Sequence, residues 1–517
     1  MKRLLTLVLC AAMTVSLFAG CGGKKDPGAY TPTGDGLTWD EDYTGPVNTA
    51  PVTQIKKMTL TWYPDKGTNP YTCTEFTNQA LYSLVYQGLF SVDRDYSIEP
   101  VLCKNYSMSE DMKTYTFYPA AATFADGSAL TAEDIVASLE AARAGVVYSG
   151  RFSHVQQVAL SQDGGVTVVM DTPYENLPLL LDVPIVKASD VELPNPMGTG
   201  PYALESANGA SLLRRRSDWW CHANLPVNTT AITLVTAQSA TQIRDTFEFE
   251  DLSLVYADPG SDRYADYRCD YELWDCENGV FLYLACNMNS LIFSDPAIRS
   301  ALTGVIDRER IAADNYRGFA RVAYLPASPQ SPYYNKTLAS RYGYDAGAAF
   351  TQAVAAAQLP ADTVLKLLVN SDDTLRSRIA RDIATALRSC GMTVELLALD
   401  SEEYRYYLKM GWYDLYLGQT RLSPNMDLTA FFSSSGALSW GALDSVSLYT
   451  LCTEALANHG NFYTLHQNVM DDGRLCPVLF SSYAVYATRG LLTGLTPARD
   501  NVFYYSLGRS MESARLE

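Results

Sequence analysis

Between residues 363 and 421 the sequence alternates apolar, strand-like runs with helical patterns, and this alternation constrains the fold class most strongly. Residues 363–370, 393–399 and 413–418 are apolar enough to form buried strands. Leu375, Ile379, Ile383 and Leu387 line one helix face before Gly391, and a short helix starts at Ser401. A strand–helix–strand–helix–strand order favours a parallel sheet with right-handed crossovers. The sequence therefore predicts an α/β fold here.

The end of the third strand in this run is the first candidate for a binding site. Ligands of open α/β sheets bind beyond the carboxyl ends of the strands. The segment Leu417-Gly418-Gln419-Thr420-Arg421 is such an end. We therefore expect Gln419 and Arg421 to lie at a ligand cleft.

The first twenty residues have the pattern of an export signal. Lys2 and Arg3 form a positive start, residues 4–18 an apolar stretch, and small residues precede Cys21. This boundary resembles a bacterial lipobox, in which Cys21 receives a diacylglycerol group, although Phe18 is larger than the usual residue there. We predict a lipoprotein signal peptide over residues 1–20, with a plain secretory signal as the alternative.

Residues 21–51 are rich in Gly, Pro, Asp and Thr and predict a flexible tether. A coil of this length reaches about 30 Å. No later run approaches the roughly 20 apolar residues that a membrane-spanning helix needs. We therefore expect a protein on the extracytoplasmic face of the bacterial cell membrane, held there by its lipid.

Composition argues against several classes of function. The net charge of −18 disfavours nucleic-acid binding, which relies on clustered Lys and Arg. Of eleven cysteines, nine remain after Cys10 and Cys21, and their spacings predict neither a disulfide framework nor a zinc site. A bond between Cys269 and Cys276 stays open. Four histidines and no HExxH or GxSxG pattern give no catalytic residues, no metal site and no cofactor.

Several short motifs occur in one order along the chain and identify a family. They are Asn69-Pro70-Tyr71, Phe124-Ala125-Asp126-Gly127, Gly198-Thr199-Gly200-Pro201-Tyr202, the strand-like residues 279–287, Asp295-Pro296-Ala297-Ile298-Arg299 and Ile306-Asp307-Arg308. Together they resemble the family 5 extracytoplasmic solute-binding proteins, the oligopeptide, dipeptide and nickel-chelate receptors of ABC importers. The resemblance extends over about residues 58–508.

The resemblance implies a fold of two lobes. We expect a type II, cluster C periplasmic-binding-protein-like architecture with an extra small subdomain in lobe one. The implied boundaries are 52–285 for lobe one, with the small subdomain at about 90–190, then 286–483 for lobe two, and 484–517 for a return to lobe one.

The same resemblance implies a transport function. A monomeric receptor would capture a small solute, foremost a peptide, between its lobes and deliver it to an ABC permease. Hinge closure of such a receptor is stabilised by ligand contacts that exist only in the closed form. An adhesin or sensor that reuses the fold and a lipid-anchored hydrolase are the alternatives.

In peptide-binding relatives an Asp just after the strand that corresponds to residues 413–418 binds the ligand's α-ammonium group. Here Gln419-Thr420-Arg421 follows the strand, and the nearest carboxylate is Asp427. An Arg suits a carboxylate, sulfonate or phosphate through paired hydrogen bonds. Arg421 therefore either reads an anionic ligand or pairs with an acidic residue of the opposite lobe and latches the closed form.

Relatives also contact their ligand just after the first strand of lobe one. Asn69, Tyr71 and Thr72 occupy that position here, although Tyr71 also suits simple packing. Trp440 is a candidate wall of the cleft, since aromatic side chains with polar tips suit such surfaces.

Overall fold

The computed structural model describes residues 58–93, 95–207, 209–221, 229–237, 239–249, 251–260 and 267–488. The predicted signal peptide, the tether, Cys21 and the last part of the predicted return, residues 489–517, lie outside these residues. The statements below concern the described residues.

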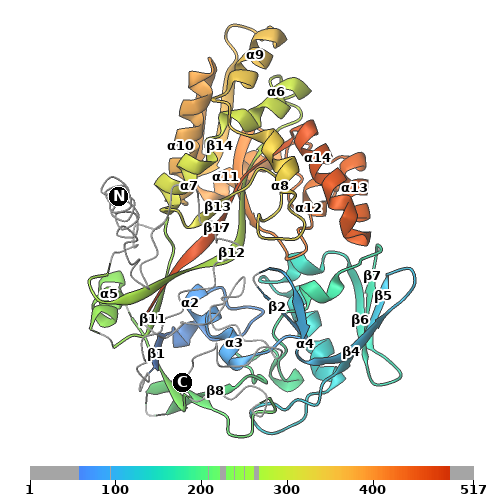
Figure 1. Ribbon diagram of the computed structural model, residues 1–517, viewed down its shortest axis with the longest axis vertical. Helices are drawn as coiled ribbons and strands as arrows, with labels where there is room; N and C mark the ends of the chain where they lie inside the picture. Colours follow the sequence, from blue (N-terminus) through green and yellow to red (C-terminus); the bar gives the residue numbers. More distant parts are fainter. Residues whose placement is uncertain are drawn as a thin grey trace, which may run out of the picture.

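The described chain forms two lobes of mixed α/β structure, as Figure 1 shows. Lobe one, at the bottom of the view, is built on two four-stranded sheets and a two-stranded hairpin; lobe two, at the top, is built on a seven-stranded sheet. This arrangement confirms the predicted fold class, including the small additional unit of lobe one.

The first sheet of lobe one has the order β1-β10-β9-β8. Only β1 and β10 run parallel, and the other pairs are antiparallel. The elements are β1 Met58–Thr61, α2 Phe76–Gln79, α3 Tyr82–Val85, β8 Tyr202–Ala207, β9 Ala210–Arg215, β10 Ala231–Val235 and α5 Ala240–Glu248.

The second sheet of lobe one, order β4-β5-β7-β6, is antiparallel throughout, and we call it with α4 the small subdomain. Thr131 caps α4 by accepting a hydrogen bond from the Asp134 amide, and Asp134 bonds back to the Thr131 amide, a reciprocal cap. The elements here are the hairpin β2 Phe90–Val92 and β3 Ile98–Pro100, then β4 Cys103–Met108, β5 Thr114–Pro119, α4 Ala132–Ala144, β6 Val155–Leu160 and β7 Val166–Met170.

The large sheet has the order β11-β17-β12-β16-β14-β15, with β13 paired to β17. Its strands are β11 Leu254–Ala257, β12 Tyr271–Cys286, β13 Ala320–Val322, β14 Val364–Asn370, β15 Thr393–Leu399, β16 Leu415–Arg421 and β17 Leu475–Thr488. Strand β14 is parallel to both β15 and β16, which confirms the expected parallel unit.

The expected end of β16 at Gly418 is wrong. The strand continues to Arg421 because its last residues pair antiparallel with β12, with Arg421 opposite Val280. Gln419 and Arg421 therefore lie within the strand rather than beyond it.

Helices cover both faces of the large sheet. Alternate residues of β12 point to opposite faces: Leu282 and Leu284 pack among α6, α7, α9 and α10, whereas Phe281 and Tyr283 pack among α11, α12, α13 and α14. These helices and α8 are α6 Pro296–Ala301, α7 Arg308–Tyr316, α8 Lys336–Ala339, α9 Ala348–Ala357, α10 Thr374–Ser389, α11 Ser401–Met410, α12 Thr429–Phe432, α13 Val446–Ala457 and α14 Phe462–Asp472. The short 3-10 helices are η1 Pro64–Lys66, η2 Ser149–Phe152, η3 Leu177–Leu180, η4 Ala188–Asp190, η5 Leu302–Val305, η6 Ser340–Tyr342 and η7 His459–Asn461.

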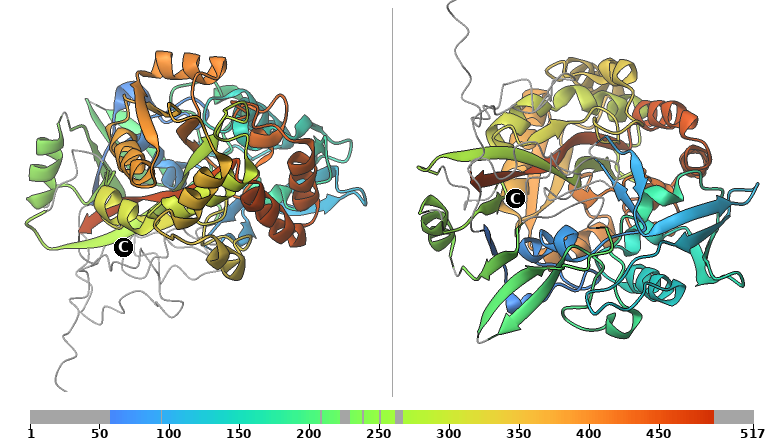
Figure 2. Two further views of the ribbon diagram at one scale, coloured as in Figure 1. Left: turned by 90° about the horizontal axis from the view of Figure 1, so that it is seen from above. Right: turned by 60° about the horizontal axis from the view of Figure 1, so that its bottom comes forward.

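Strands β12 and β17 pass from one lobe into the other. Figure 2 shows them side by side through the middle of the molecule. Cys276 and Val485 belong to the core of lobe one, whereas Leu284 and Leu479 belong to that of lobe two. Their pairing is interrupted between Glu277 and Phe281, where a bulge separates the two halves.

The motif Ile306-Asp307-Arg308 ties lobe two together around a buried cation. Arg308 is fully buried at the start of α7. Its Nε donates to the carbonyls of Ala323 (3.1 Å) and Pro477 (2.9 Å), and its Nη1 to those of Thr303 and Ile306. Carbonyl oxygens thus replace the water that a buried guanidinium loses.

The described residues bear on two expectations, one about membrane-spanning helices and one about disulfide bonds. No helix there has the length and apolar character needed to cross a bilayer. Among the described residues none of the nine cysteines, Cys269 and Cys276 included, is in a disulfide bond.

Candidate ligand-binding site

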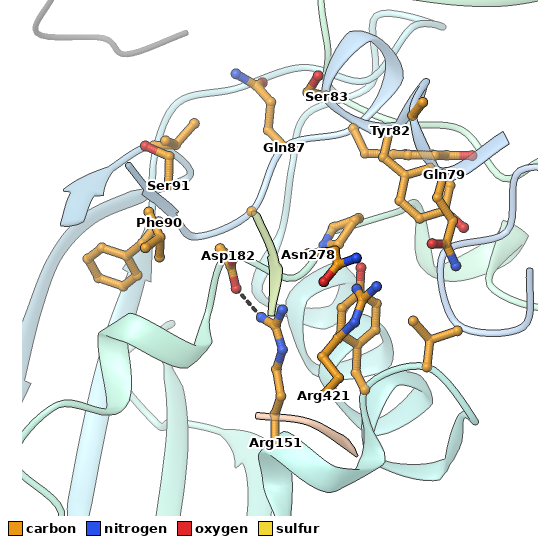
Figure 3. Close-up of a pocket in the computed structure, with 18 of the residues that line it drawn as sticks. Gln79, Tyr82, Ser83, Gln87, Phe90, Ser91, Arg151, Asp182, Asn278 and Arg421 are labelled. Carbon is orange, nitrogen blue, oxygen red and sulfur yellow. Dashed lines mark hydrogen bonds and ion pairs between the residues drawn. The ribbon is translucent and has the colours of Figure 1, made fainter. Parts of the chain in front are cut away.

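A large pocket lies between lobe one and the strands that lead into lobe two. It encloses about 1260 Å³, part of it open to solvent. Figure 3 shows its lining, which includes Gln79, Ser83, Arg151, Asp182, Asn278 and Arg421. A concave space lined by apolar side chains and a few polar and charged groups suits a small solute.

One wall of the pocket comes from α2, α3 and the segment that follows α3. Two glycines determine how closely the chain packs against the end of α3. Gly198 and Gly200 lie against the end of α3, where the Gly200 amide donates to the Val85 carbonyl at 2.9 Å. A Cβ on Gly200 would stand 2.6 Å from the Val85 carbonyl carbon, and one on Gly198 would stand 2.1 Å from the Val85 oxygen. The motif Gly198-Thr199-Gly200 therefore fixes the position of Tyr82 and Ser83 by close approach.

The charged lining residues are Arg151, Asp182 and Arg421. Arg151 forms an ion pair with Asp182 and lies over the Tyr148 ring, 5.1 Å from its centroid. Among the described residues, the exposed guanidinium of Arg421 has no hydrogen-bond or ion-pair partner. The lining therefore holds one paired and one unpaired positive charge.

Asn278 presents a second unpaired donor at the bulge of β12. Its Oδ1 accepts hydrogen bonds from the Val280 amide and from Ser481 Oγ, both at 3.0 Å. This fixes the orientation of the amide and leaves its Nδ2 group without a partner in the described part of the chain. Asn278 and Arg421 therefore both offer N–H donors to the pocket.

The three predicted site residues of lobe one lie outside the lining. Asn69 is buried, donates to the carbonyls of Val191 and Leu193 at 2.8 Å, and accepts from the Tyr71 amide. Tyr71 is buried and donates to the carbonyl of Pro184, a pocket residue, at 2.8 Å. Thr72 is exposed, and no side-chain bond of it occurs among the described residues. Burial raises the pKa of Tyr71 well above its usual range.

Of the three predicted residues of lobe two, only Arg421 lines the pocket. Gln419 is exposed on the same strand, opposite Leu282. Trp440 is half-buried and packs against the hydrophobic core that includes residues of α11, α12, α13 and α14. Asp427, the carboxylate nearest to Arg421 in sequence, is bound to His154 instead. The binding roles of all six residues stay predictions.

Sequence reasoning missed Arg151, Asp182 and Asn278. Arg151 and Asp182 come from segments without a motif, so only the fold brings them to the pocket. The pair Asn278-Gly279 carried a usable signal, because an Asn-Gly inside an apolar strand indicates a bulge. Gly279 indeed has a positive φ of 69°.

Comparison with known proteins identifies the family. A family model described as bacterial extracellular solute-binding proteins, family 5 Middle, matches residues 97–439. The chain belongs to this family. Family 5 proteins bind solutes, which agrees with the expectation that the chain is not an enzyme.

Curated relatives match over part of the chain. The glutathione-binding protein GsiB of Shigella boydii serotype 4 is 23% identical over 292 residues, which are 51% of this chain and 54% of that protein. GsiB of Salmonella typhi is 24% identical over 293 residues, with the same shares. The match thus spans about half the length of these curated relatives.

Solved structures of similar fold cover nearly the whole described chain. NikA from Brucella suis in complex with Fe(III)-EDTA has a TM-score of 0.70 at 17% identity, covering 86% of this chain and 98% of that one. A putative peptide-binding protein AppA from Clostridium difficile has a TM-score of 0.71 at 14% identity, with the same coverage. AppA from Bacillus subtilis in complex with a nonapeptide has a TM-score of 0.61 at 18% identity, covering 86% and 97%. These likenesses support the fold.

Proposed function

We propose that this protein is the substrate-binding protein of an ABC importer, which captures a small solute between its lobes and presents it to a permease. The observation that carries the proposal is the pocket between lobe one and the strands β12, β16 and β17. A solute in this pocket contacts both lobes, so its binding favours the conformation in which they meet. Membership of family 5 supports the same role.

The proposed ligand is a peptide or another solute that carries an anionic group. Arg421 and the Asn278 amide supply N–H donors, and Arg421 supplies a charge that no described residue neutralises. Carboxylates accept paired hydrogen bonds from guanidinium groups. GsiB is named for glutathione, and the NikA structure holds an EDTA complex; both of these molecules carry carboxylates.

The proposed location is the extracytoplasmic face of the bacterial cell membrane, with a monomer anchored through lipid on Cys21. The support is the sequence around Cys21, which lies outside the described residues. Labelling with a radioactive fatty acid tests the anchor. Label should enter the wild type and be absent from Cys21→Ser, whereas label in both proteins would contradict the proposal.

Native mass spectrometry of the mature chain, followed by calorimetry, tests the function. We expect a co-purified solute, or binding of glutathione or of peptides of three to nine residues, with one site per chain. The solute should be recovered unchanged after incubation. Chemical turnover of the solute, or binding outside the pocket in a complex structure, would overturn the proposal.

A further inference from the structure

The small subdomain contacts lobe two on the side of the pocket opposite the connecting strands. In Figure 1, β12 and β17 run towards β11 on the left, whereas α12 and α13 lie above β6 and β7 on the right. A hinge motion about the connecting strands therefore separates the contacts on the right. In the structure these contacts join the two lobes, and we therefore take this arrangement as the closed one.

His154 is at the centre of these contacts. It directly precedes β6, and its side chain is 7% exposed. Its Nδ1 lies 2.9 Å from Oδ1 of Asp171, at the end of β7 in the same lobe. Its Nε2 lies 2.9 Å from Thr429 Oγ1 and 3.4 Å from Asp427 Oδ2, both of lobe two.

Both ring nitrogens of His154 thus face oxygen atoms. A neutral imidazole with its proton on Nδ1 donates to Asp171 and accepts from the Thr429 hydroxyl, whereas an imidazolium donates from both nitrogens and carries a charge that both carboxylates stabilise. Burial alone would lower the pKa of His154, but Asp427 and Asp171 outweigh burial and raise it to about 9. In turn, burial would raise the pKa of Asp427, and His154 with Thr429 overcomes this and lowers it.

Other ionisable groups surround the cluster without replacing these partners. The Tyr174 ring lies 6.1 Å from the His154 ring, and Lys113 Nζ donates to the Asp171 backbone oxygen at 3.3 Å. From the side of α13, Tyr449 and Cys452 are close enough for Asp427 to raise the pKa of each, after the larger effect of burial. Arg143 of α4 binds Glu140 and the carbonyl of Val155, beside His154.

Further bonds between the lobes lie beside the cluster. Asn425 Nδ2 donates to the Tyr174 hydroxyl, and the Glu175 amide donates to the Leu456 carbonyl at 2.8 Å. Glu175 Oε2 accepts from the backbone amide and from Nδ1 of His459, both at 2.9 Å. The pair of His459 and Glu175 is solvent-exposed and therefore weak, whereas His154 and Asp427 are mostly shielded from water.

We propose that His154 and Asp427 form an ionic latch that joins the small subdomain to lobe two, so that a protonated His154 favours closure of the cleft. The latch rests on the hinge motion of the proposed function. Asp171 stays beside His154 in either arrangement, because both belong to the small subdomain. Asp427 moves away with lobe two, so of the two carboxylates beside His154 only Asp427 is lost on opening.

The loss of Asp427 from the side of His154 on opening determines the direction of the pH effect. Closure brings Asp427 to His154 and raises the pKa of the imidazole, so the closed form binds the proton more tightly. The latch stabilises the closed form fully at a pH where His154 is charged in both the open and the closed form. This stabilisation is lost as the pH rises through about 9, the pKa of His154 in the closed form. A charge-assisted hydrogen bond of this kind changes the closing equilibrium roughly 10- to 100-fold.

Small-angle scattering of the ligand-free mature protein from pH 7 to 10 tests the latch. We expect the radius of gyration of the wild type to increase towards pH 10. His154→Gln and Asp427→Asn should be more open at pH 7 and nearly independent of pH. Glu454→Gln, which removes an exposed carboxylate from α13, is the matched control and should follow the wild type.

The same experiment separates the latch from the proposed function. A radius that is constant with pH in the wild type, or variants that follow the wild-type curve, overturns the latch. Adding the solute identified by native mass spectrometry at pH 7 then shows whether a hinge exists at all. If that solute leaves the radius of every variant unchanged, hinge closure fails as well. If it compacts them, only the latch is wrong.

Discussion

At the scale of single residues, the chemistry of Arg421 was predictable and its surroundings were not. The sequence shows an Arg where peptide-binding relatives carry an Asp, and this change of charge predicts an anionic ligand group or a latch. In the structure Arg421 lines the pocket, and no described residue pairs with it. The acidic partner of the latch is instead Asp427, bound to His154. This contact joins residues 273 positions apart, and no local pattern predicts it.

Replacing Arg421 with Ala should weaken binding of an anionic solute roughly 10- to 100-fold, because a charge-assisted hydrogen bond is lost. Arg405→Ala, which removes an exposed arginine of α11 outside the lining, should change affinity by no more than about twofold. Titration calorimetry on both variants measures this. Equal affinities of Arg421→Ala and the wild type would contradict a reading role for Arg421.

His466 gives a second prediction at this scale. It is fully buried in α14 beside Phe462, and neither ring nitrogen has a partner in the described part of the chain. Burial lowers its pKa to about 3, so the folded protein keeps it neutral while the unfolded chain protonates it below about pH 6.5. Stability is therefore lost as the pH falls from about 6.5 towards 3.

His466→Leu should remove this loss. The free energy of unfolding of His466→Leu minus that of the wild type should be larger at pH 5 than at pH 8 by roughly 2 kcal/mol. Urea denaturation at the two pH values measures the difference. Effects of carboxylates are common to both proteins and cancel, so parallel pH profiles would show that His466 is not neutral when buried.

At the scale of elements, sequence patterns were sufficient wherever the deciding interactions are local. The parallel unit β14–α10–β15–α11–β16 depends on the hydrophobic periodicity of each segment, which the sequence shows directly. The end of β16 was wrong because distant pairing with β12 extends it. The sequence motif does not show why Gly198 and Gly200 are glycines; neither has a positive φ, and both are needed for close approach to Val85.

Gly200→Ala tests that interpretation. The added methyl group would overlap the end of α3, so we expect a loss of about 1–3 kcal/mol in the free energy of unfolding. Affinity should fall as well, because α3 carries Tyr82 and Ser83 of the pocket wall. Gly343→Ala is the control, since nothing lies within 4 Å of its added Cβ and its φ is −70°. Equal stability of both variants would show that close approach to Val85 is not what requires glycine at position 200.

At the scale of the whole molecule, the pocket joins six separate segments of the chain. Residues 76–101, 147–151 and 182–184 supply the lobe-one side, and Asn278, Arg421 and Tyr483 close it from the connecting strands. Composition and periodicity do not predict such an assembly, since it depends on how two separately packed cores face one another. The family resemblance did supply the two lobes, because its motifs occur in both of them.

The two cores lead to a prediction for thermal unfolding. Most of the core of lobe one belongs to one hydrophobic cluster and most of the core of lobe two to two others, with β12 and β17 as the main covalent and hydrogen-bonded link. We therefore expect calorimetry of the ligand-free protein to resolve two transitions. Gly200→Ala should lower only the lobe-one transition. Arg308→Lys should lower only that of lobe two, because it leaves buried carbonyls unpaired.

A solute held between the lobes should stabilise both transitions. At one hundred times its dissociation constant it adds about 2.7 kcal/mol to the state that binds it, and in the proposed site that state needs both lobes folded. The transitions of the wild type should then rise and merge. In Arg421→Ala the lobe-two transition should respond less, because its contact with the solute is lost. If the solute raised the lobe-one transition alone in the wild type, it would bind to one lobe, and capture between two lobes would be wrong.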